Sequence, residues 1–301
     1  MNNGFFVVED WDLFEKMLEH LYKKHIYIES SDNPVLFSEA AWNTRNKREK
    51  LCELMFEKFQ LPAFFVSKNA VLSTFANGKS SGLIFDSGAT HSSAIPVHEG
   101  QVIQSAIVKS PLGGDFLASH CEKYFADKNV EIVPSYMVES KEQVKEGEAA
   151  KWTAKTLPDN LTESWKNYMM RESFHDFKAI GLQVSDSAFN KEHCDSMPSI
   201  HYEFPNGYNI DLTSPRFWIP EALFDTSYIK AYGSTVMGLS QIITSSIGLC
   251  EQDIRNPILT NVVYTGGNTL VNGLTDRITK DLATRTPHVS FSWLFSLFLK
   301  F

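Results

Sequence analysis

The sequence is poor in cysteine and in positive charge. Its four cysteines, Cys52, Cys121, Cys194 and Cys250, lie far apart in 301 residues, and none belongs to a C-x-x-C pair. This spacing favours neither a disulfide framework nor a zinc knuckle, and it fits a reducing compartment. The formal net charge of -8 argues against direct binding to nucleic acid or anionic lipid, because both need a concentrated positive surface. Any contact with DNA is therefore expected to be indirect.

Long hydrophobic runs are missing as well. The start, MNNGFFVVEDWD, has no basic stretch, and its apolar run is too short for a signal peptide. The apolar end, VSFSWLFSLFLKF, is well short of the roughly 20 residues that a membrane helix needs. What the sequence does contain is 43% hydrophobic residues, enough to bury a sizeable core. At this length we expect a globular protein that divides into two lobes and has no membrane contact.

Apolar spacing predicts alternating helices and strands in the first third of the chain. The expected helices cover residues 10–24, 44–59 and 69–77, and the expected strands cover 34–40, 61–67 and 82–86. This order favours right-handed crossovers and a mainly parallel sheet. The segments HSSAIPV and QVIQSAIV alternate around the turn HEGQ and predict a hairpin added to that sheet. Residues 113–232 are richer in polar and turn residues, which is typical of an inserted lobe.

Two glycine turns that follow buried strands are candidates for phosphate binding. In Asp86-Ser87-Gly88 the carboxylate can hold magnesium through water, while Ser87 and the Gly88 backbone offer donors to phosphate oxygens. In Gly266-Gly267-Asn268 the missing side chains let a ligand approach the backbone at a helix start. Taken alone, the first turn is more typical of an ordinary β-turn, and the second is equally typical of a tight strand-to-helix turn. The two together, separated by an insertion, are more informative.

These segments resemble the actins and actin-related proteins. The resemblance is carried by GLIFDSGATH, VKSPLGGDF, FPNGYNID, IPEALFD and TGGNTLVNGLTDRITKDL, which follow the family's order from about Val8 to Pro287. The stretches VEDWD, AFFVSKNAVLSTFANG and LQVSDS are similar to the nuclear actin-related subunits of BAF-type (SWI/SNF-type) chromatin-remodelling complexes. The resemblance implies an α/β, actin-like ATPase (ribonuclease H-like) fold with two lobes. The first lobe would be incomplete, since the family's first phosphate hairpin would lie upstream of the segment that matches Trp11.

The resemblance also implies how the chain is divided. Residues 1–76 would form the partial first lobe, like subdomain 1 of the family. Residues 77–112 and 233–287 would form a part like subdomain 3, and residues 113–232 an inserted part like subdomain 4. Residues 288–301 would be a tail outside the family's pattern.

By the same resemblance the nucleotide site would be vestigial and the protein would not be an enzyme. Its phosphate-site residues would be Asp86, Ser87, Gly88, His91, Gly266, Gly267 and Asn268. His91 matches a histidine that polarises the attacking water, but Asn69 stands where the family has a longer glutamine, and a shift of that size is costly in rate. Val271 replaces an adenine-stacking tyrosine, and the loop after Asp86 is shorter than in actin. ATP with magnesium is therefore expected to bind weakly, with Asp86 holding the metal through water and no other metal site.

The partners implied are actin, the helix that precedes the remodeller's ATPase motor, and other subunits of nuclear remodelling and histone acetyltransferase complexes that regulate transcription. The helix would lie in a cleft whose lining matches Phe75, Ala76, Gly78, Ser80 and Gly100, where small residues allow close approach. The same residues could instead form only a hinge between lobes. Two alternatives remain open. One is a nucleotide-binding, actin-like ATPase or cytoskeletal relative, and the other is a product made unstable by exposed sheet edges.

Overall fold

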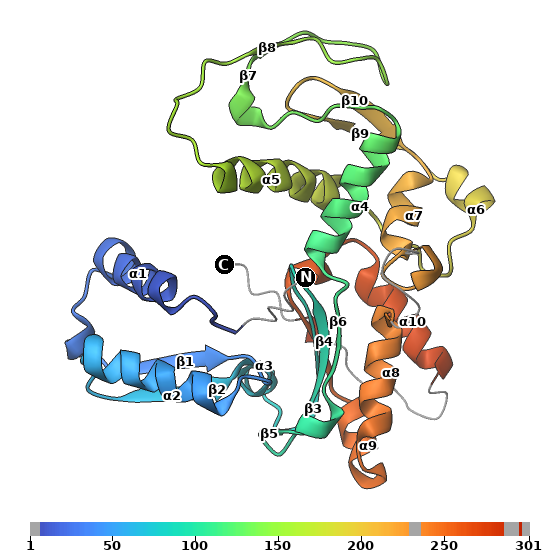
Figure 1. The fold of residues 1–301 in the computed structure, drawn as a ribbon. Helices are drawn as coiled ribbons and strands as arrows, with labels where there is room; N and C mark the ends of the chain where they lie inside the picture. Colours follow the sequence, from blue (N-terminus) through green and yellow to red (C-terminus); the bar gives the residue numbers. More distant parts are fainter. Residues whose placement is uncertain (1–6, 229–235, 286–294, 297–301) are drawn as a thin grey trace.

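The computed structural model describes residues 7–228 and 236–285 and the backbone of residues 295–296. A first part, drawn in blue in Figure 1, lies on one side of a central sheet, and a part inserted between two strands of that sheet lies at its top. The expected α/β class is confirmed. The expected boundary at residues 232/233 and most of the expected tail, 288–301, fall outside the described residues, so the division into subdomains stays a prediction.

The first part is a two-stranded sheet covered by helices. Strands β1 (Val35–Glu39) and β2 (Phe64–Lys68) pair in parallel, and helices α1 (Trp11–Leu21) and α2 (Arg45–Glu53) pack with them. The side chain of Asp10 accepts a hydrogen bond from the Leu13 amide, so Asp10 is the N-cap of α1. Both helices end in a π turn. The apolar core shared by helices and strands is formed by Leu18, Leu51, Met55, Phe59 and Leu61, with Phe37, Phe64 and Val66 beside them.

Within the described residues, the central sheet has six strands. These are β3 (Gly82–Ser87), β4 (Ser92–His98), β5 (Gln101–Val102), β6 (Val108–Ser110), β11 (Val262–Thr265) and β12 (Phe295–Ser296). Their order is β12-β11-β3-β4-β5, with β6 also paired to β4. Strands β11 and β12 run parallel to their neighbours on the path, and β3 pairs with β4 in the antiparallel direction. The hairpin predicted around the turn HEGQ is confirmed for β4 and β5.

Helices cover both faces of this sheet. Alternate residues of a strand point to opposite faces, so neighbouring residues of β3 pack against different helices. Leu83 and Phe85 pack toward helices α8 (Leu239–Leu249), α9 (Gln252–Leu259) and α10 (Leu274–Arg285), and Ile84 packs toward helix α3 (Asn69–Ala76). The residues from Leu83 to Phe85 are therefore a continuous apolar run, as expected for a strand that is buried on both faces.

The expectation of one mainly parallel sheet is wrong. Strands β1 and β2 form a sheet of their own, and β3 pairs with β4 and with β11 instead. Helix α3 follows β2 directly and packs against the central sheet, so the chain leaves the first sheet before β3 begins. Local periodicity predicts a strand but cannot show that its parallel partner lies far along the chain. The expected second strand of the hairpin, QVIQSAIV, is also interrupted, because a turn at Gln104–Ala106 separates β5 from β6.

The inserted part is built on helices α4 (Gly114–Asp127), α5 (Glu163–Gly181) and α7 (Pro215–Glu221). The short helix α6 (Lys191–Asp195) and two hairpins complete it, β7 (Val138–Lys141) with β8 (Trp152–Ala154) and β9 (Ile200–Glu203) with β10 (Asn209–Leu212). Aromatic rings dominate its core, where the ring centres of Phe125, Phe177 and Phe204 lie 5.0 to 5.4 Å apart. Over the described ranges, no helix combines the length and the apolar character that crossing a bilayer requires.

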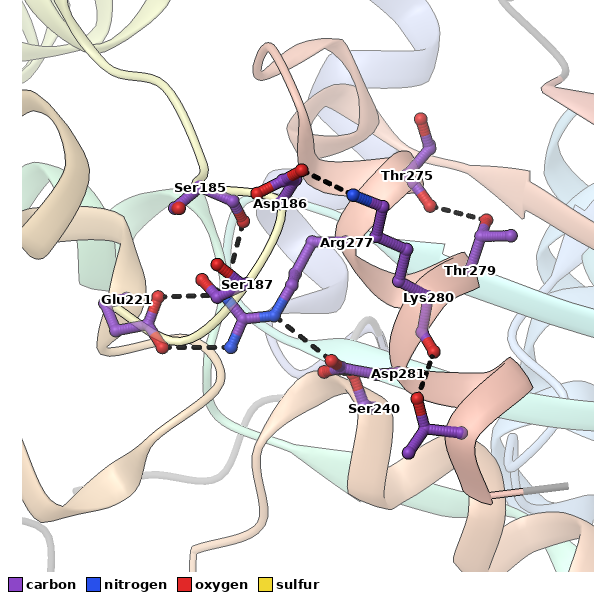
Figure 2. Close-up of polar contacts among 11 residues, drawn as sticks. Ser185, Asp186, Ser187, Glu221, Ser240, Thr275, Arg277, Thr279, Lys280 and Asp281 are labelled. Carbon is purple, nitrogen blue, oxygen red and sulfur yellow. Dashed lines mark hydrogen bonds and ion pairs between the residues drawn. The ribbon is translucent and has the colours of Figure 1, made fainter. Parts of the chain in front are cut away.

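A buried ion-pair network joins the inserted part to α10 (Figure 2). Arg277 donates to both carboxylate oxygens of Glu221, each at 3.0 Å, and both side chains are nearly inaccessible to water. The same guanidinium donates to the backbone oxygens of Ser185 and Ser187, and its Nε donates to Asp281. One side chain thus connects α7, α10 and the loop after α5.

Replacing Arg277 with leucine should lower the free energy of unfolding by about 3–5 kcal/mol, because the Glu221 carboxylate would stay buried without its partner. Urea unfolding at pH 7 measures this. The control is Lys280→Ala, which removes an exposed ion pair with Asp186 and should lower the free energy of unfolding far less, because water screens that pair. An equal loss of unfolding free energy in the two variants would contradict the view that this network stabilises the attachment of the inserted part to α10.

Candidate nucleotide site and partner cleft

The two predicted phosphate turns lie side by side. Asp86 of β3 is opposite Thr265 of β11, so the turns that follow these strands meet at the same edge of the sheet. Gly266 has φ 93°, and a Cβ atom there would lie 2.3 Å from the backbone oxygen of Ser87. Only glycine fits this position. The structure therefore brings Asp86, Ser87 and Gly88 together with the Gly266-Gly267-Asn268 turn, as the sequence predicts.

The side chain of Asn268 links the turns directly. It is buried, and its Nδ2 donates to the Ser87 hydroxyl at 3.2 Å and to the Gly88 carbonyl at 2.9 Å. The sequence names Asn268 as a site residue but gives no sign of this contact, because the two partners come from turns that are distant along the chain.

The loop after Asp86 rests on the start of α4. The amides of Gly114 and Asp115 donate to the backbone oxygens of Gly88 and Ala89, at 2.9 and 2.7 Å. Gly113 permits this approach, since a Cβ there would be only 2.4 Å from the Ala89 oxygen. The Gly88 amide itself donates to the His91 carbonyl at 3.0 Å. The amides at the start of this helix, which could bind an anion, therefore hold carbonyl oxygens of the protein.

His91 is buried beside Trp42, with their ring centres 5.2 Å apart. Burial, and secondarily the charge of Lys109, lowers the pKa of His91 to about 4. The ring is consequently neutral at pH 7, and its Nδ1 lies 3.0 Å from the Thr90 hydroxyl. A neutral imidazole can accept a proton, but only weakly when its pKa is this low.

The residues expected at the water-activating position surround one cavity. Asn69, Asp86 and His91 line a space of about 220 Å³, and Trp11, Phe37 and Trp42 from the first part of the chain line it as well. Burial raises the pKa of the Asp86 carboxyl. Sequence reasoning missed Trp42, whose place in the sequence just after a strand does not show that it reaches His91.

Lys178 is a second residue that sequence reasoning missed. It lies on α5, is buried, and its Nζ donates to the Gly114 carbonyl at 3.3 Å, beside His175. A Cβ atom on Gly114 would lie 2.8 Å from this Nζ and 2.9 Å from Asn268 Oδ1, so the lysine is close to the second turn. Burial lowers its pKa. The sequence signal was a lysine that follows Phe177 directly and lies at helical spacing from Phe174 and Gly181.

The fit of magnesium and nucleotide to these residues is only partial. Nothing lies within 4 Å of a Cβ built on Gly267, so a ligand could approach that backbone, whereas the Gly88 amide and the Asn268 amide are engaged inside the protein. Val271, at the place of the family's stacking tyrosine, belongs to the apolar core. Among the described residues, no three His, Cys, Asp or Glu side chains gather as a metal site.

The predicted partner cleft forms an exposed surface where α3 meets the turn between β4 and β5. The Phe75 ring is 54% exposed and lies over Gly100, where a Cβ atom would be 2.9 Å from the ring. The Gly100 amide donates to the Ser80 carbonyl at 2.8 Å, and the Gly78 amide donates to the Phe75 carbonyl. Ala76 is exposed next to Phe75. The structure thus gathers Phe75, Ser80 and Gly100, with Ala76 and Gly78 adjoining.

The family model for actin matches residues 1–292. The chain belongs to the actin family. It is similar to actin-related protein 4 of Arabidopsis thaliana, with 34% identity over 291 residues that cover 94% of this chain and 65% of that protein. Actin-related protein 4 of Oryza sativa subsp. indica is 36% identical over 283 residues, which cover 91% of this chain and 63% of the relative. The expected actin-like fold is therefore confirmed.

A further relative is the SWI/SNF and RSC complexes subunit arp42 of Schizosaccharomyces pombe. It is 30% identical over 293 residues that cover 92% of this chain and 69% of that protein. The resemblance to actin-related proteins of chromatin-remodelling complexes is thereby confirmed at the level of the family. The chain spans about two thirds of the length of the relatives it matches.

Protonation of His91 in mild acid should lower the free energy of unfolding. The folded pKa is about 4 and an unfolded histidine titrates near 6.5, so the unfolded chain binds more protons between these values. The free energy of unfolding should then fall as the pH drops from about 6.5 towards 4. Urea unfolding at pH 7 and pH 5 should show a smaller pH-dependent loss in His91→Gln than in the unchanged protein. The same loss in both, or an NMR titration of His91 near 6.5, would contradict the assignment.

Proposed function

We propose that the chain is a non-catalytic, actin-related scaffold subunit of nuclear chromatin-remodelling complexes. Membership of the actin family and similarity to a protein named as a SWI/SNF and RSC subunit support the general class. The observation that carries the proposal is a contrast within this structure. The Gly88 amide and the Asn268 side-chain amide of the phosphate turns donate to acceptors inside the protein, whereas the Phe75 surface is open to a partner.

Several features argue against turnover of a nucleotide. Asn69 has a shorter reach than the glutamine of the family, and His91 has a pKa of about 4. An effective base for water must hold a position within hydrogen-bond reach and titrate near the working pH. These residues meet neither condition well, although they do line one cavity.

That shared cavity is the observation in favour of the second candidate, a nucleotide-dependent hydrolase. Asn69, Asp86 and His91 come from three different elements, yet the fold places them around the same space. Magnesium-dependent release of phosphate from ATP, abolished in Asp86→Ala, would favour the hydrolase over the scaffold.

The proposed partners are actin, other subunits of the remodelling or histone acetyltransferase complexes that regulate transcription, and the helix before the remodeller's motor. The helix would lie on the surface formed by Phe75, Ala76, Gly78, Ser80 and Gly100. An exposed aromatic ring beside residues with little or no side chain can pack against the apolar face of an amphipathic helix. Direct DNA binding is not part of the proposal, because the chain carries a net charge of -8.

Truncation of Phe75 to alanine should weaken binding of that helix about tenfold or more, which is the effect of losing one central aromatic contact. The measurement is a fluorescence titration of a labelled peptide that spans the helix before the ATPase motor of a SWI/SNF ATPase subunit. The matched control is Phe65→Ala, which removes a ring that is 67% exposed on β2, outside the proposed cleft. Equal affinities for Phe75→Ala and the unchanged chain would contradict this surface.

A further inference from the structure

A chain of hydrogen bonds with a fixed direction runs through the phosphate turns. A serine hydroxyl has one hydrogen to donate. Ser92 donates its hydrogen to the Leu112 carbonyl at 2.6 Å, because a carbonyl oxygen can only accept. In the 2.7 Å contact between Ser87 and Ser92, the donor must therefore be Ser87. Since Asn268 donates to Ser87, the direction is Asn268 to Ser87 to Ser92 to the Leu112 carbonyl.

This direction determines what Ser87 can offer a ligand. Its only hydrogen points at Ser92, in the interior of the sheet, and both serines are completely buried. To donate to a phosphate oxygen, the Ser87 hydroxyl would have to turn away from Ser92 and give up that bond. The position that looks like a phosphate donor in the sequence is thus an internal donor in the fold.

The neighbouring donors are engaged in the same way. The Gly88 amide donates to the His91 carbonyl, and the amides of Gly114 and Asp115 donate to Gly88 and Ala89. The Asn268 amide group donates to both Ser87 and Gly88. A polyphosphate needs several donors at once, so each internal acceptor that it must replace reduces the affinity.

We propose that this hydrogen-bond chain keeps the phosphate turns closed to polyphosphate, and that Ser92 is the residue that holds the Ser87 donor inward. The inference rests on the proposed non-catalytic function, because it gives the physical reason why the site would bind nucleotide weakly. It adds a residue, Ser92, which lies in β4 opposite Ser87 and is not among the residues expected to meet a ligand.

The test compares binding of magnesium tripolyphosphate by the unchanged chain and by two variants of Ser92. Ser92→Ala removes the acceptor for Ser87 but also leaves the Leu112 carbonyl unpaired. Ser92→Cys keeps nearly the same size, and its thiol is a much weaker acceptor for the Ser87 hydroxyl. Calorimetry should show at least about fivefold tighter binding in both variants, which is the effect of about one net hydrogen bond.

Two controls sharpen the result. Ser92→Thr retains the hydroxyl and should bind as weakly as the unchanged chain. Asn272→Ala changes an exposed side chain beside the second turn and should leave the affinity unaltered. A Ser92→Cys protein that melts cooperatively yet binds tripolyphosphate no more tightly than the unchanged chain would overturn the proposal. So would micromolar binding by the unchanged chain.

The failure of this inference can be told apart from failure of the proposed function. Phosphate release from ATP is measured on the same samples. Release by the unchanged chain that disappears in Asp86→Ala would refute the non-catalytic function, whatever the Ser92 variants do. Tighter tripolyphosphate binding in the Ser92 variants without release would support both.

Discussion

The parallel pairing of β3 with β11 is the contact on which the candidate site depends. It places Asp86 opposite Thr265, and from that register follow the meeting of the two glycine turns, the close approach at Gly266 and the reach of Asn268 to Ser87. The inserted part lies between these two strands in the sequence. Its return to the core is held by the Arg277 network, which buries a charged pair whose partners come from α7 and α10. The geometry of the turns and the attachment of the insertion are therefore linked.

The proposed hydrogen-bond chain would let an actin-family fold retain the outline of a phosphate site without offering it to a ligand. A hydrogen-bond donor serves either the protein or a ligand at a given moment. Here the turns, the start of α4 and the Asn268 amide bind one another, and a buried lysine, Lys178, lies next to them. Such a network rigidifies the junction between the central sheet and the inserted part. A rigid junction is useful in a protein that presents a surface to partners.

Much of the fold can be predicted from the sequence because its signals are local. The Asp10 cap, the helix that ends before Gly78 and the hairpin around Glu99-Gly100 depend on neighbouring residues. The separate β1–β2 sheet could not be predicted, since strand partners far along the chain leave no trace in periodicity. For the site, the sequence predicts both glycine turns and His91. It gives no indication of Ser92 or Trp42, and for Lys178 it offers only a lysine among apolar residues of a helix, because each reaches the site through a contact that only the packed structure creates.

The central claim is that the chain acts by assembly and not by turnover of a nucleotide. The most direct measurement is affinity purification of the tagged chain from nuclear extract, with its partners identified by mass spectrometry and compared with those of an Asp86→Ala variant. Both forms should recover actin and the ATPase subunit of a chromatin-remodelling complex in equal amounts. Recovery of cytoskeletal proteins without remodelling subunits, or loss of the partners in Asp86→Ala, would contradict this claim.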